Sequence, residues 1–220
     1  MTVVVLLGAP GAGKGTQAAT LAERLGIPHI ATGDLFRAAV RDGTDIGLEA
    51  AAYMSRGELV PDGITVRMLL ERLGRADAAA GAVLDGFPRN REQAVALDTA
   101  LTARAARVDR AIHIEVPADD LVRRLSGRWT CRAEGHIYHD VSHPPRVLGV
   151  CDIDGSALYQ RDDDRVETIR ARLAQQLGAL GEVVAYYRER GVLGQVDGRG
   201  TIDAVTAAVV AQVASLPRTA

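Results

Sequence analysis

Residues 8–16 read Gly-Ala-Pro-Gly-Ala-Gly-Lys-Gly-Thr, and these residue types at this spacing are suited to binding phosphate. The segment follows an apolar run at residues 3–7 and precedes a stretch with helical periodicity, which predicts a turn between a buried strand and a helix. Glycines in such a turn let backbone N–H groups approach an anion, and the helix N-terminus adds positive potential. The spacing from Gly8 to Lys14 fits the P-loop pattern G-x-x-x-x-G-K, so we expect a nucleotide phosphate site here.

Lys14 is the only lysine among the 26 lysine and arginine residues of the chain. A compact ammonium can reach between two phosphates, so its use here favours a phosphate site over a solvated lysine in a glycine-rich turn. The pattern departs in one detail from other P-loops. In those, the residue next to the lysine is a Ser or Thr whose hydroxyl binds Mg²⁺. Here Gly15 takes that position and the hydroxyl comes next, at Thr16.

Polar residues also follow two other predicted strands. Thr32 and Arg37 come after residues 27–30, and Asp85 directly follows the buried run at residues 82–84. Ligands of doubly wound α/β proteins bind beyond the carboxyl ends of the strands, so these side chains are placed to meet one. Asp85 has the position of a Walker-B-type aspartate, which holds Mg²⁺ or its water shell. Taken alone, Thr32 is better explained as a helix N-cap and Arg37 as a solvated surface charge.

The predicted elements alternate between strands and helices. Apolar runs predict strands at residues 3–7, 27–30, 82–84, 111–116 and 192–197, and helical periodicity marks residues 16–25, 119–128, 169–187 and 203–215. This alternation predicts a parallel α/β sheet flanked by helices. Arg124 and Arg128 stand four residues apart in the third helical pattern, so we expect them on one helix face.

Two regions interrupt the alternation. Residues 31–60, called the helical flap below, contain short helical patterns broken by glycine. Residues 127–164, called the β-rich insert, are rich in His, Pro, Gly and Asp and show little helical period. We therefore expect one domain over residues 1–220 with two insertions.

Composition excludes several function classes. A net charge of −2 gives no support for general nucleic-acid binding, and the chain has no apolar run long enough to cross a membrane. We see no signal peptide at the N-terminus. Two cysteines do not make a disulfide framework, which fits a cytoplasmic protein.

Several motifs occur in an order that resembles the adenylate kinase family, in particular its bacterial members with a long lid. These are the P-loop, Thr32-Gly33-Asp34 followed by Arg37, Asp85-Gly86-Phe87-Pro88-Arg89 followed by Gln93, and Arg161-Asp162-Asp163-Asp164. The resemblance covers essentially residues 1–215. It implies a P-loop NTPase-type CORE with a five-stranded parallel sheet, a nucleoside-monophosphate-binding flap at residues 31–60 and a LID at residues 127–164.

The resemblance also implies two substrate sites and a set of catalytic residues. The ATP site would consist of Gly11, Ala12, Gly13, Lys14, Gly15, Thr16, Arg124, Arg128, Ile137, Tyr138 and Gly200. The AMP site would consist of Thr32, Arg37, Glu58, Leu59, Val60, Gly86, Phe87, Pro88, Arg89 and Gln93, with Arg161 and Arg172 closing over the transferred group. Lys14, Arg89, Arg124, Arg128, Arg161 and Arg172 would be the catalytic residues, and Asp85 would hold Mg²⁺ through water.

A metal site in the β-rich insert is a further possibility. Relatives with a zinc lid carry Cys-x-x-Cys and a second Cys-x-x-Cys or Cys-x-x-Asp here, whereas this chain has Cys131-x-x-Glu134 and Cys151-x-x-Asp154. Two thiolates with two carboxylates are an unusual structural zinc set, and three nearby histidines could change it. The alternative is a pair of reduced thiols; a disulfide is less expected in a reducing compartment.

These features predict a cytoplasmic, monomeric kinase that catalyses MgATP + AMP ⇌ 2 ADP. No general base is required, because a phosphomonoester already presents an anionic oxygen at pH 7. Three alternatives remain: a kinase for another nucleoside monophosphate, a P-loop ATPase or switch, and a zinc module that binds nucleic acid. The acceptor-site arginines argue against the second, and the net charge argues against the third.

Overall fold

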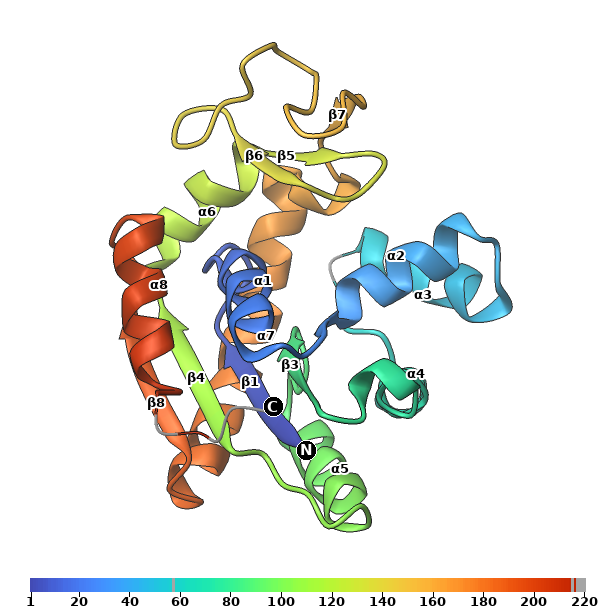
Figure 1. Cartoon of the computed structure of the whole chain (residues 1–220). Coiled ribbons are helices and arrows are strands. Elements are labelled where there is room, and N and C mark those ends of the chain that lie inside the picture. Colours follow the sequence, from blue (N-terminus) through green and yellow to red (C-terminus); the bar gives the residue numbers. More distant parts are fainter. Residues whose placement is uncertain (57, 215, 217–220) are drawn as a thin grey trace.

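The computed structural model describes residues 1–56, 58–214 and 216, and a parallel sheet forms its centre (Figure 1). The strands of this sheet are β1 (Thr2–Leu7), β2 (His29–Ala31), β3 (Gly81–Asp85), β4 (Arg110–Glu115) and β8 (Leu193–Asp197). Their order is β2-β3-β1-β4-β8, and every neighbouring pair is parallel. The five strands predicted from the sequence are confirmed. β1, which leads into the glycine-rich loop, occupies the middle of the sheet.

Helices cover both faces of the sheet. They are α1 (Lys14–Leu25), α4 (Asp62–Leu73), α5 (Arg91–Thr102), α6 (Ala118–Ser126), α7 (Val166–Glu189) and α8 (Ile202–Ala211), with short 3-10 turns at Ala76–Ala78 and Asp162–Asp164. Within the described part of the chain, none of the helices combines the length and apolar character that crossing a bilayer would require.

The alternation of β1 side chains explains why two separate cores form. Val4 and Leu6 belong to one apolar cluster with α1, α6 and α8, whereas Val3, Val5 and Leu7 belong to another with α4 and α5. Successive strand residues point to opposite faces, so an uninterrupted apolar run is what a strand covered on both faces needs. The long helix α7 contributes to both clusters and so links the two faces.

Two helix ends differ from the sequence-based predictions. α6 ends at Ser126 and Arg128 begins a strand, so the expectation that Arg124 and Arg128 share a helix face is wrong. The reason is Gly127, whose C=O accepts a hydrogen bond from the Asp140 N–H at 3.0 Å and so starts sheet pairing. α8 ends at Ala211, and Ser215, the predicted helix end, lies outside the described residues.

The β-rich insert folds as a small unit with its own core. It contains β5 (Arg128–Cys131), β6 (Ile137–His139) and β7 (Leu158–Tyr159), which form an antiparallel sheet in the order β6-β5-β7. Cys131, Tyr138, Cys151 and Leu158 are buried against one another beneath this sheet. In Figure 1 the insert lies at the top, beyond α6, while the helical flap lies to the right of α1.

The helical flap depends on one close backbone approach. It contains α2 (Thr32–Arg41) and α3 (Asp45–Ser55). A Cβ on Gly47 would lie 2.1 Å from the carbonyl oxygen of Ala39, so the backbones of α2 and α3 meet at this glycine. Gly47 is thus required by packing, although nothing in the local sequence pattern indicates it.

We predict that Gly47→Ala lowers the free energy of unfolding by about 1–3 kcal/mol, because the added methyl group must push the two helices apart. Gly178→Ala in α7 is the matched control, since a Cβ at Gly178 meets open space. The control should raise stability by about 0.5–1 kcal/mol through helix propensity. Urea unfolding of both variants measures the difference, and equal effects would contradict the packing argument.

Candidate active site

The glycine-rich loop between β1 and α1 forms a cradle closed by Lys14. Gly11 and Gly13 adopt φ values of 85° and 89°, a region that favours glycine. A Cβ on Gly11 would also lie 2.9 Å from Cγ of Leu125 in α6. Lys14 is the first residue of α1, and its Nζ donates to the carbonyl oxygens of Gly8 at 2.9 Å and Ala9 at 3.0 Å. The ammonium is therefore held over the loop, where an anion would bind.

Asp85 lies beside this cradle, as the sequence predicted, because β3 pairs with β1 and places Asp85 opposite Leu6. Burial lowers the pKa of Lys14 to about 8, against the raising effect of Asp85. Burial also acts to raise the pKa of Asp85, but His29 and Lys14 together hold it below its ordinary value. The Asp85 carboxylate is thus ionised at neutral pH and can act as an oxygen ligand.

Two neighbouring carboxylates position two of the predicted arginines. Asp164 accepts hydrogen bonds from Nε of Arg128 at 2.8 Å and Nη2 at 2.5 Å, a bidentate pair with a fully buried carboxylate. Arg172 contacts the Asp163 carboxylate at 3.0 Å and donates to the Asp163 carbonyl oxygen at 2.9 Å. Asp162, the third acid of the run, is exposed and pairs with Arg165 at 3.5 Å. Asp163 and Asp164 therefore orient the cations.

Two further arginines are half-buried near these pairs. Nε of Arg89 donates to the Gly86 carbonyl oxygen at 2.7 Å, and Nε of Arg161 donates to Oγ1 of Thr130 at 3.0 Å. Burial, followed by the charge of Arg172, lowers the pKa of Arg89 to about 10. Burial and neighbouring arginines lower the pKa of Arg161 to about 10 as well. Both groups stay charged at pH 7, so the cluster repels itself and favours a bound anion.

Arg124 has a different environment from the other predicted arginines. Its Nη2 donates to the carbonyl oxygen of Gly198 at 2.8 Å, which ties α6 to the loop after β8. Gly200, predicted to contact adenine, is exposed in the same loop. Arg124 thus positions the segment that carries Gly200.

A cavity of about 60 Å³ brings together most of the residues predicted for AMP. Those lining it are Thr32, Arg37, Glu58, Leu59, Val60, Arg89, Gln93 and Arg172. Gly33, Phe36, Met54, Thr65, Asp163 and Gln176 also line it and were missed, although Phe36 could have been found because it stands one helical turn after Thr32.

Four predicted residues do not line this cavity: Gly86, Phe87, Pro88 and Arg161. Phe87 is buried in the sheet core instead. The carbonyl oxygen of Gly86 accepts hydrogen bonds from both Arg89 and Thr32, the latter at 2.8 Å. The N-cap interpretation of Thr32 is therefore wrong, because Ala31 caps α2 and the Thr32 hydroxyl is used across the sheet edge.

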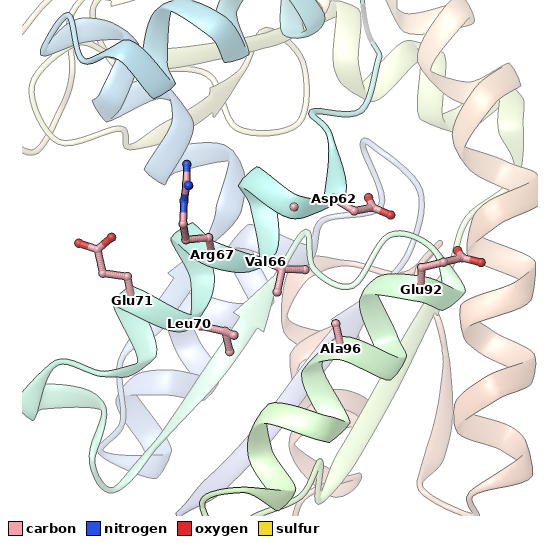
Figure 2. Close-up of a pocket in the computed structure, with 8 residues that line it drawn as sticks. Asp62, Val66, Arg67, Leu70, Glu71, Glu92 and Ala96 are labelled. Carbon is pink, nitrogen blue, oxygen red and sulfur yellow. The ribbon is translucent and has the colours of Figure 1, made fainter.

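A larger, open groove of about 820 Å³ lies between α4 and α5, away from this cluster of arginines (Figure 2). Val66, Leu70 and Ala96 form its apolar floor, while Glu71 and Glu92 lie on opposite sides of it. Arg67 also lines the groove, but the carboxylates of Asp62, Glu71 and Glu92 outnumber it, so the smaller cavity with its several arginines is the candidate substrate site.

Comparison with known proteins agrees with this geometry. A family model described as adenylate kinase matches residues 6–192. An adenylate kinase of Streptomyces griseus is 50% identical over 205 residues, covering 93% of this chain and 94% of the relative. One from Staphylococcus epidermidis is 48% identical over 207 residues, covering 94% and 96%. The chain belongs to the adenylate kinase family.

Most of the predicted site lies inside the matched region, and Gly200 lies beyond it. The predicted nucleotide contact of Tyr138 is limited by its burial: the side chain is in the core of the β-rich insert, and its hydroxyl accepts a hydrogen bond from the Asp152 N–H at 2.8 Å. Ile137, the other residue of β6 predicted to contact ATP, is exposed.

The β-rich insert contains a compact group of metal-binding atoms that differs from the predicted one. Cys131, His136, Cys151 and Asp154 each offer a ligand atom, and these atoms lie within 4.8 Å of one another. The sequence offered Glu134 as a possible ligand and left the nearby histidines open; in the structure it is His136, and not Glu134, that belongs to this group. The chain turns tightly at Gly135, which leaves Glu134 exposed with only its backbone N–H directed to Cys131 Sγ, at 3.4 Å. The two cysteines are not joined in a disulfide.

We predict that binding of a non-hydrolysable ATP analogue near pH 8 takes up a proton at Lys14. The ligand-free pKa is about 8, so about half of the molecules lack this proton, and a nearby triphosphate raises the pKa. Calorimetry in buffers of different ionisation enthalpy measures this uptake. Lys14→Arg is the control, because a guanidinium stays protonated and should take up none. Equal uptake by both proteins would contradict the prediction.

Proposed function

We propose that the protein transfers the terminal phosphoryl group of MgATP to AMP and that the products are two ADP molecules. The observation that carries this proposal is a continuous row of cations between two sites. Lys14 lies at the glycine-rich loop, Arg172 lines the second cavity, and Asp163 and Asp164 join Arg172 to Arg128. One end suits a triphosphate and the other suits the phosphate of an acceptor.

On the ATP side, we assign the phosphates to residues 11–16 and to Arg128. Backbone N–H groups at the start of α1 and the Lys14 ammonium are the donors. Ile137, the backbone of Tyr138 and the Gly200 carbonyl oxygen are assigned to the nucleoside, with Arg124 holding the loop of Gly200 in place.

On the AMP side, Arg37 and Arg89 are assigned to the phosphate, and Thr32 and Gln93 to the base. Glu58, Leu59 and Val60 close the cavity around the nucleoside. Gly86 holds Thr32 and Arg89 through one carbonyl oxygen, which links base and phosphate positions to a single backbone turn.

Catalysis in this arrangement is positioning and charge stabilisation. Phosphoryl transfer passes through a loose transition state with charge spread over equatorial oxygens, and planar guanidinium groups bind such oxygens bidentately. Arg89, Arg161 and Arg172 supply this charge from three different segments. The AMP phosphate is anionic at pH 7 and needs no general base. Mg²⁺, when bound, neutralises the phosphates of ATP, and the ionised Asp85 carboxylate would hold it through water.

Exclusion of water requires two moving parts. We propose that these are the helical flap at residues 31–60 and the β-rich insert, acting as the LID at residues 127–164. The cavity of about 60 Å³ is far smaller than ligand pockets of about 300–1,000 Å³, so the flap must open to admit AMP. Closure then keeps water from competing with AMP for the phosphoryl group. We also propose a cytoplasmic monomer, because all the assigned residues come from one chain.

The main alternative is an ATPase or nucleotide switch. It is tested by incubating the protein with MgATP and AMP, CMP, UMP or GMP in parallel. ADP formation that requires AMP supports the proposal. Release of free phosphate without any acceptor would support the alternative, and another preferred acceptor would reassign the base site.

We predict that Arg89→Lys lowers kcat/KM for AMP by about 10²-fold or more, because an ammonium cannot replace a bidentate guanidinium in the transition state. Arg72→Lys is the control, since Arg72 pairs with Asp77 on the surface. The control should match the unchanged protein in initial-rate assays. A loss below about tenfold at Arg89 would remove it from the catalytic assignment.

We further propose that the insert holds structural zinc through Cys131, His136, Cys151 and Asp154. Tetrahedral zinc with bonds of about 2.0–2.3 Å places its ligand atoms about 3.3–3.8 Å apart. The group is close to this, with Cys131 Sγ 3.0 Å from the Asp154 carboxylate and Cys151 Sγ 3.3 Å from Nδ1 of His136. Burial acts to raise the pKa of the Cys131 thiol, but hydrogen bonds, chiefly from Ser156, lower it to about 7, which favours the thiolate that binds metal.

We predict about one zinc per chain in the purified protein. His136→Ala should lose the metal and lower the melting temperature, because it removes one of four ligands. Glu134→Ala should keep the metal and the melting temperature of the unchanged protein, since Glu134 is exposed and does not belong to the group. Metal analysis and thermal unfolding of the two variants decide the point: metal retained in His136→Ala, or lost in Glu134→Ala, would overturn this ligand set.

A further inference from the structure

Asp62, which none of the sequence motifs marks, makes a specific contact with the predicted base-reading residue. It is the first residue of α4 and lines one end of the α4–α5 groove, and Figure 2 shows its side chain on the side where α5 begins. Its carboxylate accepts a hydrogen bond from Nε2 of Gln93 at 2.8 Å and two from Nδ2 of Asn90 at 3.0 Å. Asp62 lies just beyond the helical flap, two residues after Val60.

The Gln93 side chain is held in one orientation by two groups of opposite kind. Its Oε1 accepts a hydrogen bond from the Arg89 backbone N–H at 2.8 Å, while its Nε2 donates to Asp62. A backbone N–H can only donate and a carboxylate can only accept, so the positions of the amide oxygen and nitrogen are fixed chemically. Turning the amide over would place oxygen against the carboxylate and NH₂ against the N–H.

The fixed amide has capacity for one more hydrogen bond at each end. An amide nitrogen carries two hydrogens and the oxygen has two lone pairs, and one of each is used in the contacts just described. Gln93 also lines the candidate acceptor cavity. It can therefore offer one N–H and one lone pair, in a set order, to a purine edge.

We propose that Asp62 is a positioning residue that makes the acceptor site select 6-aminopurine over 6-oxopurine monophosphates. This rests on the proposed function, in which Gln93 contacts the acceptor base. Adenine presents a donor at N6 beside an acceptor at N1, which matches Oε1 and Nε2 in their fixed order. Hypoxanthine has the same shape but presents an acceptor at O6 beside a donor at N1, so both contacts become repulsive.

The test compares AMP with inosine monophosphate, IMP, as acceptors for Asp62→Asn. An asparagine can present either an oxygen or an NH₂ group to Gln93, so one of the two constraints on the amide is lost. The ratio of kcat/KM for AMP to that for IMP should fall by about tenfold or more. Asp62→Ala, which removes the carboxylate without adding an amide, should also lower this ratio. Asp62→Glu, which keeps an acceptor-only group, should retain most of it.

Asp77→Asn is the matched control, because it removes a surface carboxylate that pairs with Arg72, and its ratio should equal that of the unchanged protein. Thermal unfolding confirms that each variant is folded. Equal loss of rate with AMP and IMP in both Asp62→Asn and Asp62→Ala would overturn the inference, because a purely structural contact affects both acceptors alike. Gln93→Leu distinguishes a failure of the base assignment of Gln93 from a failure of the positioning role of Asp62. If it keeps the preference for AMP, the base-reading assignment itself fails; if it loses the preference while the Asp62 variants keep it, only the inference about Asp62 fails.

Discussion

The site depends on the ion pairs that Asp163 and Asp164 make with Arg172 and Arg128. Burying a charge is costly unless it is paired, and Asp164 is fully buried with a bidentate partner. These pairs join the start of the β-rich insert, through Arg128, to the beginning of α7, through Arg172. Loss of the Asp164 carboxylate would leave Arg128 without its partner and would free the insert from the helix that links the two cores of the protein.

The pairing is incomplete, and this incompleteness is what gives the site its chemistry. Arg89 and Arg161 have no carboxylate partner among the contacts described above, and their pKa values are lowered to about 10 by burial and by the neighbouring arginines. Lys14, too, is held against carbonyl oxygens with a lowered pKa. A bound polyphosphate would offset the burial of these cations and the repulsion among them at the same time. We therefore expect substrate binding to be driven by the same electrostatic interaction that stabilises the transition state of phosphoryl transfer.

The sequence predicted the sheet and the phosphate loop well, because both depend on local patterns. An apolar run covered on both faces identifies a parallel strand, and the spacing of glycines and lysine identifies the loop. The contacts that the sequence did not predict arise from tertiary structure. Gly127 ends a helix whose pattern continues to Arg128. The Thr32 hydroxyl donates across the sheet edge to Gly86, whereas the sequence alone favoured a helix cap.

Dependence on tertiary structure also explains two further contacts that the sequence did not predict. Glu134 stands at the expected ligand position in the sequence, but the turn at Gly135 brings His136 to the cysteines. Asp62 contacts Gln93 from 31 residues away, and no spacing rule connects them. Side chains whose partners come from a distant segment become evident only once the backbone path is known.

The central claim is that phosphate charge, more than base recognition, completes the cationic site. It is tested most directly by the melting temperature of the protein with ATP and AMP, compared with adenosine at the same concentration. We predict a rise of about 10–20 °C with both nucleotides at about 100 times their dissociation constants, and almost none with adenosine. An equal rise with adenosine would show that base contacts dominate and would contradict the account.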